Sequence, residues 1–219
     1  TIRDQLKLRT IGYDYHQTAT TCVVRTEEPH SSCARQWFLT KGPLAMLPLG
    51  DRHEVAVVWS SFQSMTALDN QAFAAELFHA SEGELGGIVA VGPRFEFPLR
   101  QQQVLQYVGE GFALLGDAAH AIHPLAGQGA NLGFGDARVL VTELSAARIE
   151  GRAPGDLDVL KRYERARLVE NHLTALAMEG FHRLFTSKMI WPMLLRNQGL
   201  RFFDSSETLK ILAIDFASK

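Results

Sequence analysis

An acid, a proline and several glycines are closely spaced in the middle of the chain. Gly116-Asp117 follows a short apolar run that is typical of a strand, and a buried carboxylate at this position can accept hydrogen bonds from the hydroxyl groups of a ligand. Gly127 and Gly129 permit close approach of the backbone to a ligand. A helix expected from about Asn131 would present unpaired N–H groups and partial positive charge. The spacing therefore predicts a site for an anionic or electron-accepting ligand.

The glycines alone have two interpretations. The run from Gly127 to Gly133 superficially resembles a dinucleotide-binding fingerprint, which should follow its strand directly. Eleven residues, Pro124 among them, separate Leu115 from Gly127, so an ordinary dinucleotide-binding first turn is rejected. Without their neighbours, the glycines are equally compatible with a purely structural turn.

Metal and thiol chemistry have little support in the sequence. His120 and His123 have the i, i+3 spacing of two helical metal ligands, but no third ligand follows at a suitable distance. Structural roles are favoured for both histidines, and no metal is predicted. Cys22 and Cys33 form neither a zinc pattern nor a disulfide framework, so we expect both to be inert in a reducing compartment.

The elements that must position the acid and the glycines begin with a sheet. Short β-branched or aromatic runs alternate with turns in the first part of the chain, which favours antiparallel strands. A further strand is expected at 88–99, with a helical or turn segment at 100–108 and a strand at 112–115 leading to Gly116. The four earlier strands are expected at 18–26, 34–40, 44–49 and 54–60.

Helical spacing of apolar residues appears twice outside the glycine-rich segment. Residues 66–80 predict one helix, with Asp69 placed to cap its start, and residues 156–185 predict a long second helix. A net charge of −2 without a basic run gives no reason to expect nucleic-acid binding. No apolar run reaches the roughly 18 residues needed to span a bilayer.

Two adjacent motifs are more specific than the glycines. GDAAH, followed by HPLAGQGANLGFGD, resembles the second flavin-contacting motif of the FAD-dependent aromatic hydroxylases, the group-A flavoprotein monooxygenases. The resemblance implies that Asp117 binds the ribityl chain of FAD and that the proline–glycine loop lies along the isoalloxazine ring. A helix N-terminus on the pyrimidine side would stabilise the reduced, anionic flavin. The implied FAD contacts are Gly116, Asp117, Pro124, Gly127, Gly129, Ala130, Asn131 and Leu132.

Other segments resemble the ubiquinone-biosynthesis branch of this family: GYDY, WFLTKGPLAMLPL, FPLRQQQVLQYV and LLRNQGL. The resemblance implies an enzyme that hydroxylates the ring of a polyprenyl phenol or quinol, with FAD as cofactor and NAD(P)H and O2 as co-substrates. A hydroperoxide of the flavin would transfer the oxygen, so no side chain is predicted to be catalytic. An epoxidase or a halogenase keeps the same class with different chemistry, but a halogenase lysine is missing from the motif.

The fold class expected is α+β, as part of an α/β FAD-binding fold. It would comprise a substrate-binding antiparallel sheet (1–105), the flavin-motif strand, loop and helix (106–150), and C-terminal helices (151–219). The residues that we expect to line the substrate pocket are Phe95, Phe97, Pro98, Leu99, Leu44, Met46 and Pro48, with core packing as the alternative.

An amphipathic segment near the C-terminus has two interpretations. Trp191, Leu194, Leu195, Leu200, Phe202 and Phe203 lie among basic residues. They would face a membrane surface or a partner, or pack against the rest of the enzyme, and the packing role is favoured. The predicted location is the cytoplasm, with peripheral association at the inner membrane and a quinone-biosynthesis complex as candidate partners.

The chain departs from the family at its N-terminal side. The GxGxxG unit that binds the FAD pyrophosphate is absent from the 219 residues. We therefore expect a C-terminal portion of a longer enzyme, which by itself would hold FAD weakly and be inactive. The alternative is a non-catalytic scaffold or docking subunit of a quinone-biosynthesis assembly, although the set of Asp117, Pro124, Gly127 and Gly129 would be unnecessary in a scaffold.

Overall fold

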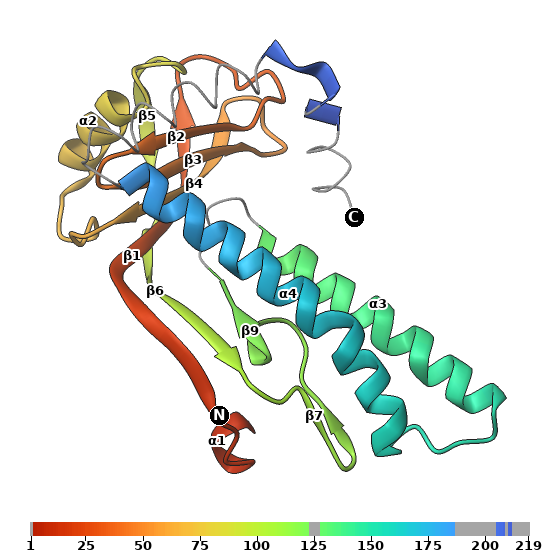
Figure 1. The fold of residues 1–219 in the computed structure, drawn as a ribbon. Coiled ribbons are helices and arrows are strands. Elements are labelled where there is room, and N and C mark those ends of the chain that lie inside the picture. The colour runs from red at the N-terminus through yellow and green to blue at the C-terminus, as the bar shows by residue number, and fades with distance from the viewer. Residues whose placement is uncertain (1, 123–127, 187–204, 209, 212–219) are drawn as a thin grey trace. The chain divides into compact units, whose positions relative to one another are not determined.

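The computed structural model describes residues 2–122, 128–186, 205–208 and 210–211. The chain forms two compact units, one made of Thr1–Tyr13 with Arg100–Lys219 and the other of Asp14–Leu99. Long strands connect the units (Figure 1). The three-part division expected from the sequence, with boundaries at 105 and 150, stays a prediction.

The unit formed by Asp14–Leu99 is built on an antiparallel sheet, as the sequence predicts. Its strands are ordered β2-β3-β4-β1, and β5 also pairs with β1. The register aligns Thr20 of β1 with Trp59 of β4, which in turn faces Leu44 of β3. The strand bounds are β1 Thr10–Thr26, β2 Arg35–Leu39, β3 Gly42–Pro48, β4 Glu54–Ser61 and β5 Ile88–Val91.

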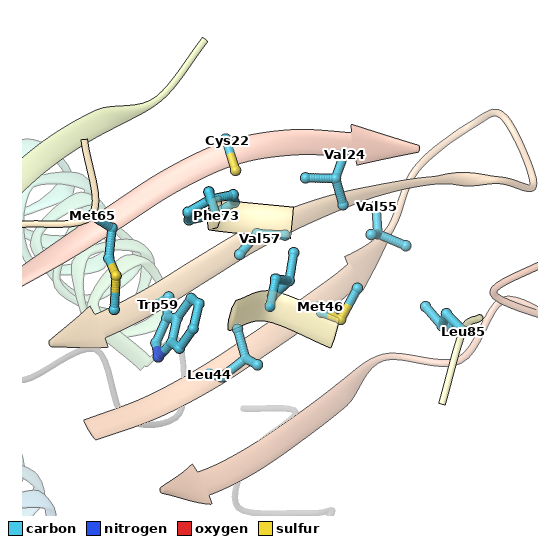
Figure 2. Packing of buried hydrophobic residues seen from close by; sticks show 11 residues of the cluster. Cys22, Val24, Leu44, Met46, Val55, Val57, Trp59, Met65, Phe73 and Leu85 are labelled. Atoms are coloured by element: carbon cyan, nitrogen blue, oxygen red, sulfur yellow. The ribbon is translucent and has the colours of Figure 1, made fainter. Parts of the chain in front are cut away.

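One face of this sheet is covered by α2 (Asn70–Ala80). Asp69 caps the helix, as predicted, because its Oδ1 accepts the backbone N–H of Ala72 at 2.7 Å. Phe73 and Leu77 are completely buried against the strands. Figure 2 shows the packed cluster, whose members are Cys22, Val24, Leu44, Met46, Val55, Val57, Trp59, Met65, Phe73, Leu77 and Leu85.

The segment from 88 to 108 differs from its predicted structure. The single strand expected at 88–99 is divided, since β5 ends at Val91 and β6 spans Phe95–Val104. The helical or turn segment expected at 100–108 is wrong, because β6 continues to Val104. Gln102 pairs with Ala121 of the short strand β9 (His120–Ala121), a partner distant in sequence. Pairing of this kind overrides the local preferences of a glutamine run.

The other unit is dominated by two long helices, α3 (Gln128–Ile149) and α4 (Leu157–Thr186), which lie side by side (Figure 1). They confirm the helices expected in the flavin motif and after it. None of the helices in the described ranges combines the length and the apolar composition that spanning a bilayer requires. The remaining elements are α1 Ile2–Gln5, β7 Val108–Gly109, β8 Phe112–Ala113 and the 3₁₀ turn η1 Gly116–Ala118.

The core of this unit joins the short strands to the helices. Tyr107 and Tyr163 are its largest fully buried side chains. Burial of aromatic residues of this size contributes strongly to stability. The other buried members are Val104, Val108, Leu114, Ala119 and Leu160. The core therefore fixes the segment just before Gly116 against α4.

Candidate flavin site

The predicted acid stands on a tight turn. Gly116 begins η1 with φ +54°, a left-handed conformation that favours glycine. Asp117 follows it, and its side chain is exposed. The expectation of a buried carboxylate at this position is wrong, because Asp117 is exposed. An exposed carboxylate on a fixed turn is still available to accept hydrogen bonds from a ligand.

The turn packs closely on α3. A Cβ at Gly133 would lie 3.4 Å from the Cα of Gly116, so the two backbones are in van der Waals contact. Farther along the helix, a Cβ at Gly135 would lie only 2.9 Å from Nη2 of Arg167. Gly133 and Gly135 thus allow close packing of α3 against the turn and against Arg167, and this packing explains why glycine stands at both positions.

The link between the turn and α3 is Asp136, which is fully buried. Its Oδ2 accepts the backbone N–H of Gly116 at 2.9 Å and lies 2.6 Å from Nε2 of His120. Its Oδ1 accepts Nε–H of Arg167 at 2.7 Å and Nδ2–H of Asn171 at 3.1 Å. An ionised carboxylate accepts about two hydrogen bonds per oxygen, so the capacity of Asp136 is filled.

His120 completes the connection to the sheet. Its side chain is buried, and the ring nitrogen facing Asp136 carries the proton because an ionised carboxylate can only accept. The Nδ1 atom has no hydrogen-bond partner within the part of the chain that the structure describes. Among the described residues no cluster of three or more potential metal ligands is found. The preference for a structural role over metal binding stays a prediction.

Arg167 brings α4 into the same cluster. Besides Asp136, its guanidinium donates to the backbone O of Leu132 at 3.3 Å and to Oδ1 of Asn171 at 2.9 Å, and it contacts Glu170. The side chain is buried, with 2% of its surface exposed. Because the guanidinium is planar and carries five donors, it can hold Asp136 and the first turn of α3 at the same time.

The charges of the cluster compensate one another. Burial opposes ionisation of Asp136, but hydrogen bonds from His120, Arg167, Gly116 and Asn171 outweigh it and lower the pKa of the carboxyl to about 2. Burial raises the pKa of the Tyr163 hydroxyl well above its usual range. Asp136 is therefore ionised and Tyr163 neutral at ordinary pH.

α4 also holds the strand that leads into the turn. The Tyr163 hydroxyl donates to the backbone O of Leu114 at 2.7 Å, and Oε1 of Glu164 accepts the backbone N–H of Tyr107 at 2.7 Å. These bonds fix the backbone on one side of Gly116, and Asp136 fixes Gly116 itself. The direction in which Asp117 leaves the turn is set by this support.

The predicted FAD contacts fall into three groups, of which the first is Gly116 and Asp117 on the η1 turn. Pro124 and Gly127 lie outside the described residues. The helix α3 begins at Gln128, three residues before the predicted start at Asn131. Its first five residues therefore include Gly129, Ala130, Asn131 and Leu132. Among the described residues, no atom lies within 4 Å of the place that a Cβ at Gly129 would take, so these residues leave open space beside this turn.

The residues present fit the flavin that the sequence implies. The first turn of the 22-residue helix α3 holds no acidic residue, so its partial positive charge is not offset there. The exposed carboxylate of Asp117 supplies acceptors for hydroxyl groups, and Gly129 leaves room for a ring. A cofactor with a sugar-alcohol chain and an electron-accepting ring matches this set of groups.

The residues expected to line a substrate pocket lie on opposite faces of the sheet. Leu44 and Met46 are completely buried beneath α2, and Figure 2 shows both in that core. Glu96 of β6 points to the same side, where it accepts the backbone N–H of Met65 at 2.7 Å. Side chains alternate along a strand, so Phe95, Phe97 and Leu99 lie on the other face.

On that other face, Leu99 packs with Tyr15 and Ala19, whereas Phe95 and Phe97 are 60% and 56% exposed. Pro98 is exposed and Pro48 is half-buried. Core packing thus accounts for Leu44 and Met46, but it does not account for Phe95 and Phe97. The assignment of all seven residues to a substrate pocket remains a prediction.

Sequence reasoning did not find the buried cluster. Asp136 ends the quoted motif, but no role was assigned to it. One signal was present in α4, where Tyr163, Arg167, Asn171 and Thr174 recur at helical spacing and are all buried. Polar residues on the core-facing stripe of a helix require buried partners, and that requirement could have led to Asp136.

Residues 2–175 match the model of the FAD-binding domain family, and the chain belongs to this family. It is 38% identical to the ubiquinone hydroxylase UbiL of Rhodospirillum rubrum, over 94% of this chain and 48% of that protein. It is 34% identical to the 3-demethoxyubiquinol 3-hydroxylase of Escherichia coli, over 99% of this chain and 56% of that protein. The predicted resemblance to FAD-dependent hydroxylases of the ubiquinone branch is confirmed.

Solved structures support the same fold. The p-nitrophenol 4-monooxygenase PnpA of Pseudomonas putida superposes with a TM-score of 0.78 at 18% identity, covering 99% of this chain and 55% of that one. The anhydrotetracycline hydroxylase OxyS of Streptomyces rimosus gives a TM-score of 0.62 at 26% identity, covering 99% of this chain and 41% of that one. The chain spans about half the length of the curated relatives that it matches.

Proposed function

We propose that the protein containing this chain is an FAD-dependent monooxygenase. It would use NAD(P)H and O2 to hydroxylate the aromatic ring of a polyprenyl phenol or quinol in ubiquinone biosynthesis. The observation that carries the proposal is the η1 turn held against α3 by Asp136, with Asp117 exposed at its tip. It occurs in a chain that is 38% identical to a ubiquinone hydroxylase.

The described residues would hold the ribityl and ring portions of FAD. Asp117 accepts hydrogen bonds from the ribityl hydroxyls, and the first turn of α3 directs its N–H groups at the electron-accepting ring. When bound, FAD supplies the electron transfer and oxygen activation that side chains cannot. The protein supplies position and electrostatic stabilisation, so we assign no catalytic side chain. Pro124 and Gly127 complete the proposed contact set.

The substrate would lie against the sheet face opposite α2. Phe95 and Phe97 expose aromatic surface there, next to the buried Leu99. Aromatic side chains suit an aromatic ring and its apolar tail because they bury large area with few rotatable bonds. Leu44, Met46, Pro48 and Pro98 alternate to the α2 face, where core packing accounts for Leu44 and Met46, so the pocket proposed on the opposite face does not include these four residues.

An oxygen-isotope assay tests the proposal. The open reading frame that contains this chain is expressed, and the purified protein is given FAD, NADH or NADPH, and a polyprenyl phenol under ¹⁸O2. We expect NAD(P)H oxidation that depends on the phenol, and one ¹⁸O atom in the ring of the product. The isoprenoid tail without a ring serves as the control and should give only background oxidation.

The scaffold alternative predicts a different result in the same assay. A scaffold or docking subunit would show no phenol-dependent oxidation and would bind no flavin. Oxidation of NAD(P)H without isotope in the product would indicate a flavoprotein with other chemistry, and it would also contradict the proposed hydroxylation.

Two further expectations belong to the proposal. The 219 residues alone would hold FAD weakly and be inactive, which an FAD titration of the isolated chain tests.

The protein would act in the cytoplasm at the inner membrane surface, with a quinone-biosynthesis complex as partner. The amphipathic segment proposed for that contact, including Trp191 and Phe203, lies outside the described residues. Vesicle flotation of a Trp191→Asp variant tests the membrane contact.

A further inference from the structure

The buried cluster of Asp136, Arg167, Asn171 and His120 is more elaborate than packing of two helices requires. Removing two charges from water is costly unless each is paired and hydrogen-bonded. Here every acceptor site of Asp136 is used, and Arg167 reaches Asp136, Leu132, Asn171 and Glu170. An apolar pair of similar volume would join α3 and α4 at lower cost.

The buried cluster forms hydrogen bonds to the flavin motif. Three of its bonds end on backbone or side chains of the flavin motif: the N–H of Gly116, the ring of His120 and the carbonyl of Leu132. Gly116 and Leu132 belong to the two segments that the ligand would touch, and the side chains that they bond, Asp136 and Arg167, are buried. A small displacement of Gly116 would move Asp117, and a small displacement of Leu132 would move the first turn of α3.

We infer that Arg167 of α4 is a positioning residue of the flavin site, acting through Asp136 and Leu132 to fix the Asp117 turn relative to the start of α3. The inference rests on the proposed function, and it extends the site to a helix that has no residue in the glycine-rich motif. Arg167 is buried and would not touch the cofactor itself. Its planar guanidinium donates to two elements from rigidly spaced N–H groups, an arrangement that the compact ammonium group of lysine does not reproduce.

The test compares two arginine-to-lysine changes on the same helix. Arg167→Lys keeps the positive charge but removes the planar set of guanidinium N–H donors. Arg162→Lys alters an arginine that makes surface ion pairs with Glu150 at 3.1 Å and Glu143 at 3.9 Å. In the protein expressed from the whole reading frame, we expect Arg167→Lys to raise the Kd for FAD about tenfold, as loss of one charge-assisted hydrogen bond would. The visible spectrum of the bound flavin should shift as well. Arg162→Lys should leave both unchanged.

The outcomes separate the inference from the proposed function. All titrations are made below the melting temperature of each variant. A lower melting temperature with unchanged Kd and flavin spectrum would mean that Arg167 has only a structural role, which would overturn the inference alone. Failure of the unaltered protein to bind flavin would overturn the proposed function and the inference with it.

A second variant covers the case in which Arg167→Lys does not fold. Asn171→Ala retains the Arg167–Asp136 pair and removes one donor to Asp136 and one acceptor of Arg167. We expect a smaller increase in the Kd for FAD, about threefold, in a folded protein. An unchanged Kd in this variant would overturn the inference.

Discussion

The carboxylate of Asp136 on α3 accepts the backbone N–H of Gly116 at 2.9 Å, twenty residues earlier in the chain. The bond connects the helix of the flavin motif to the turn that carries its acid. It also removes the N–H of Gly116 from the groups available to a ligand. In the proposed flavin site, Asp117 and the first turn of α3 would contact the ligand, and Asp136 would hold the turn in place.

Asp136→Asn should destabilise the protein in a pH-dependent manner. The pKa of Asp136 is lowered from 3.8 to about 2 in the folded state. Ionised Asp136 therefore contributes stability above its unfolded pKa, and that contribution is lost as the pH falls through the folded pKa. The shift corresponds to about 2 kcal/mol. Urea unfolding of both proteins should show a difference that is full at pH 7 and shrinks between about pH 4 and pH 2.

The control for this experiment is Asp158→Asn, whose side chain is 83% exposed on α4. It should change the free energy of unfolding little at any pH. A difference between unaltered protein and Asp136→Asn that stays constant down to pH 2 would show that Asp136 is not held ionised by its hydrogen bonds.

Gly135→Ala and Gly180→Ala should have opposite effects although both lie inside helices. A Cβ at Gly135 would be 2.9 Å from Nη2 of Arg167, whereas a Cβ at Gly180 would meet no atom of the described residues within 4 Å. The first change should cost about 1–3 kcal/mol because the buried guanidinium must move. The second should stabilise by up to about 1 kcal/mol through helix propensity. Thermal melts measure both, and equal effects would contradict the close contact at Gly135.

The sheet face opposite α2 offers a test that separates function from stability. Phe97 is 56% exposed, so Phe97→Ala should change the free energy of unfolding by less than about 0.5 kcal/mol. If Phe97 contacts substrate, the same change should raise KM for the polyprenyl phenol several-fold. Leu99→Ala, two residues along the strand and 7% exposed, should instead cost about 2–4 kcal/mol. An unchanged KM for Phe97→Ala would remove this residue from the proposed pocket.

The two cysteines should differ in reactivity. Cys33 is exposed, whereas burial raises the pKa of the Cys22 thiol to about 11. Because the thiolate is the reactive form, a disulfide reagent at pH 8 should modify one thiol in the native protein and two after denaturation. Cys33→Ser should remove the native reaction. Rapid modification of Cys22 in that variant would contradict its burial beneath α2.

The sequence predicted the elements better than the contacts between them. Alternating strands, the Asp69 cap and the long helix from 156 follow from local patterns, and the structure agrees with them. The strand character of 100–104 could not be predicted, because it depends on pairing with His120 and Ala121. Motif resemblance likewise identified Asp117 and the glycines, which are proposed as flavin contacts. The Asp136–Arg167 pair joins residues 31 apart and has no local signature.

The most direct test of the central claim is an equilibrium titration with FAD of the protein expressed from the reading frame that contains this chain. We expect one FAD per protein, and an increase in Kd of about tenfold or more on Asp117→Ala, since its hydrogen bonds to the ribityl hydroxyls would be lost. Asp158→Ala should leave the Kd unchanged. Absence of flavin binding, or equal affinity in the Asp117→Ala variant, would contradict the assignment of this turn as the flavin site.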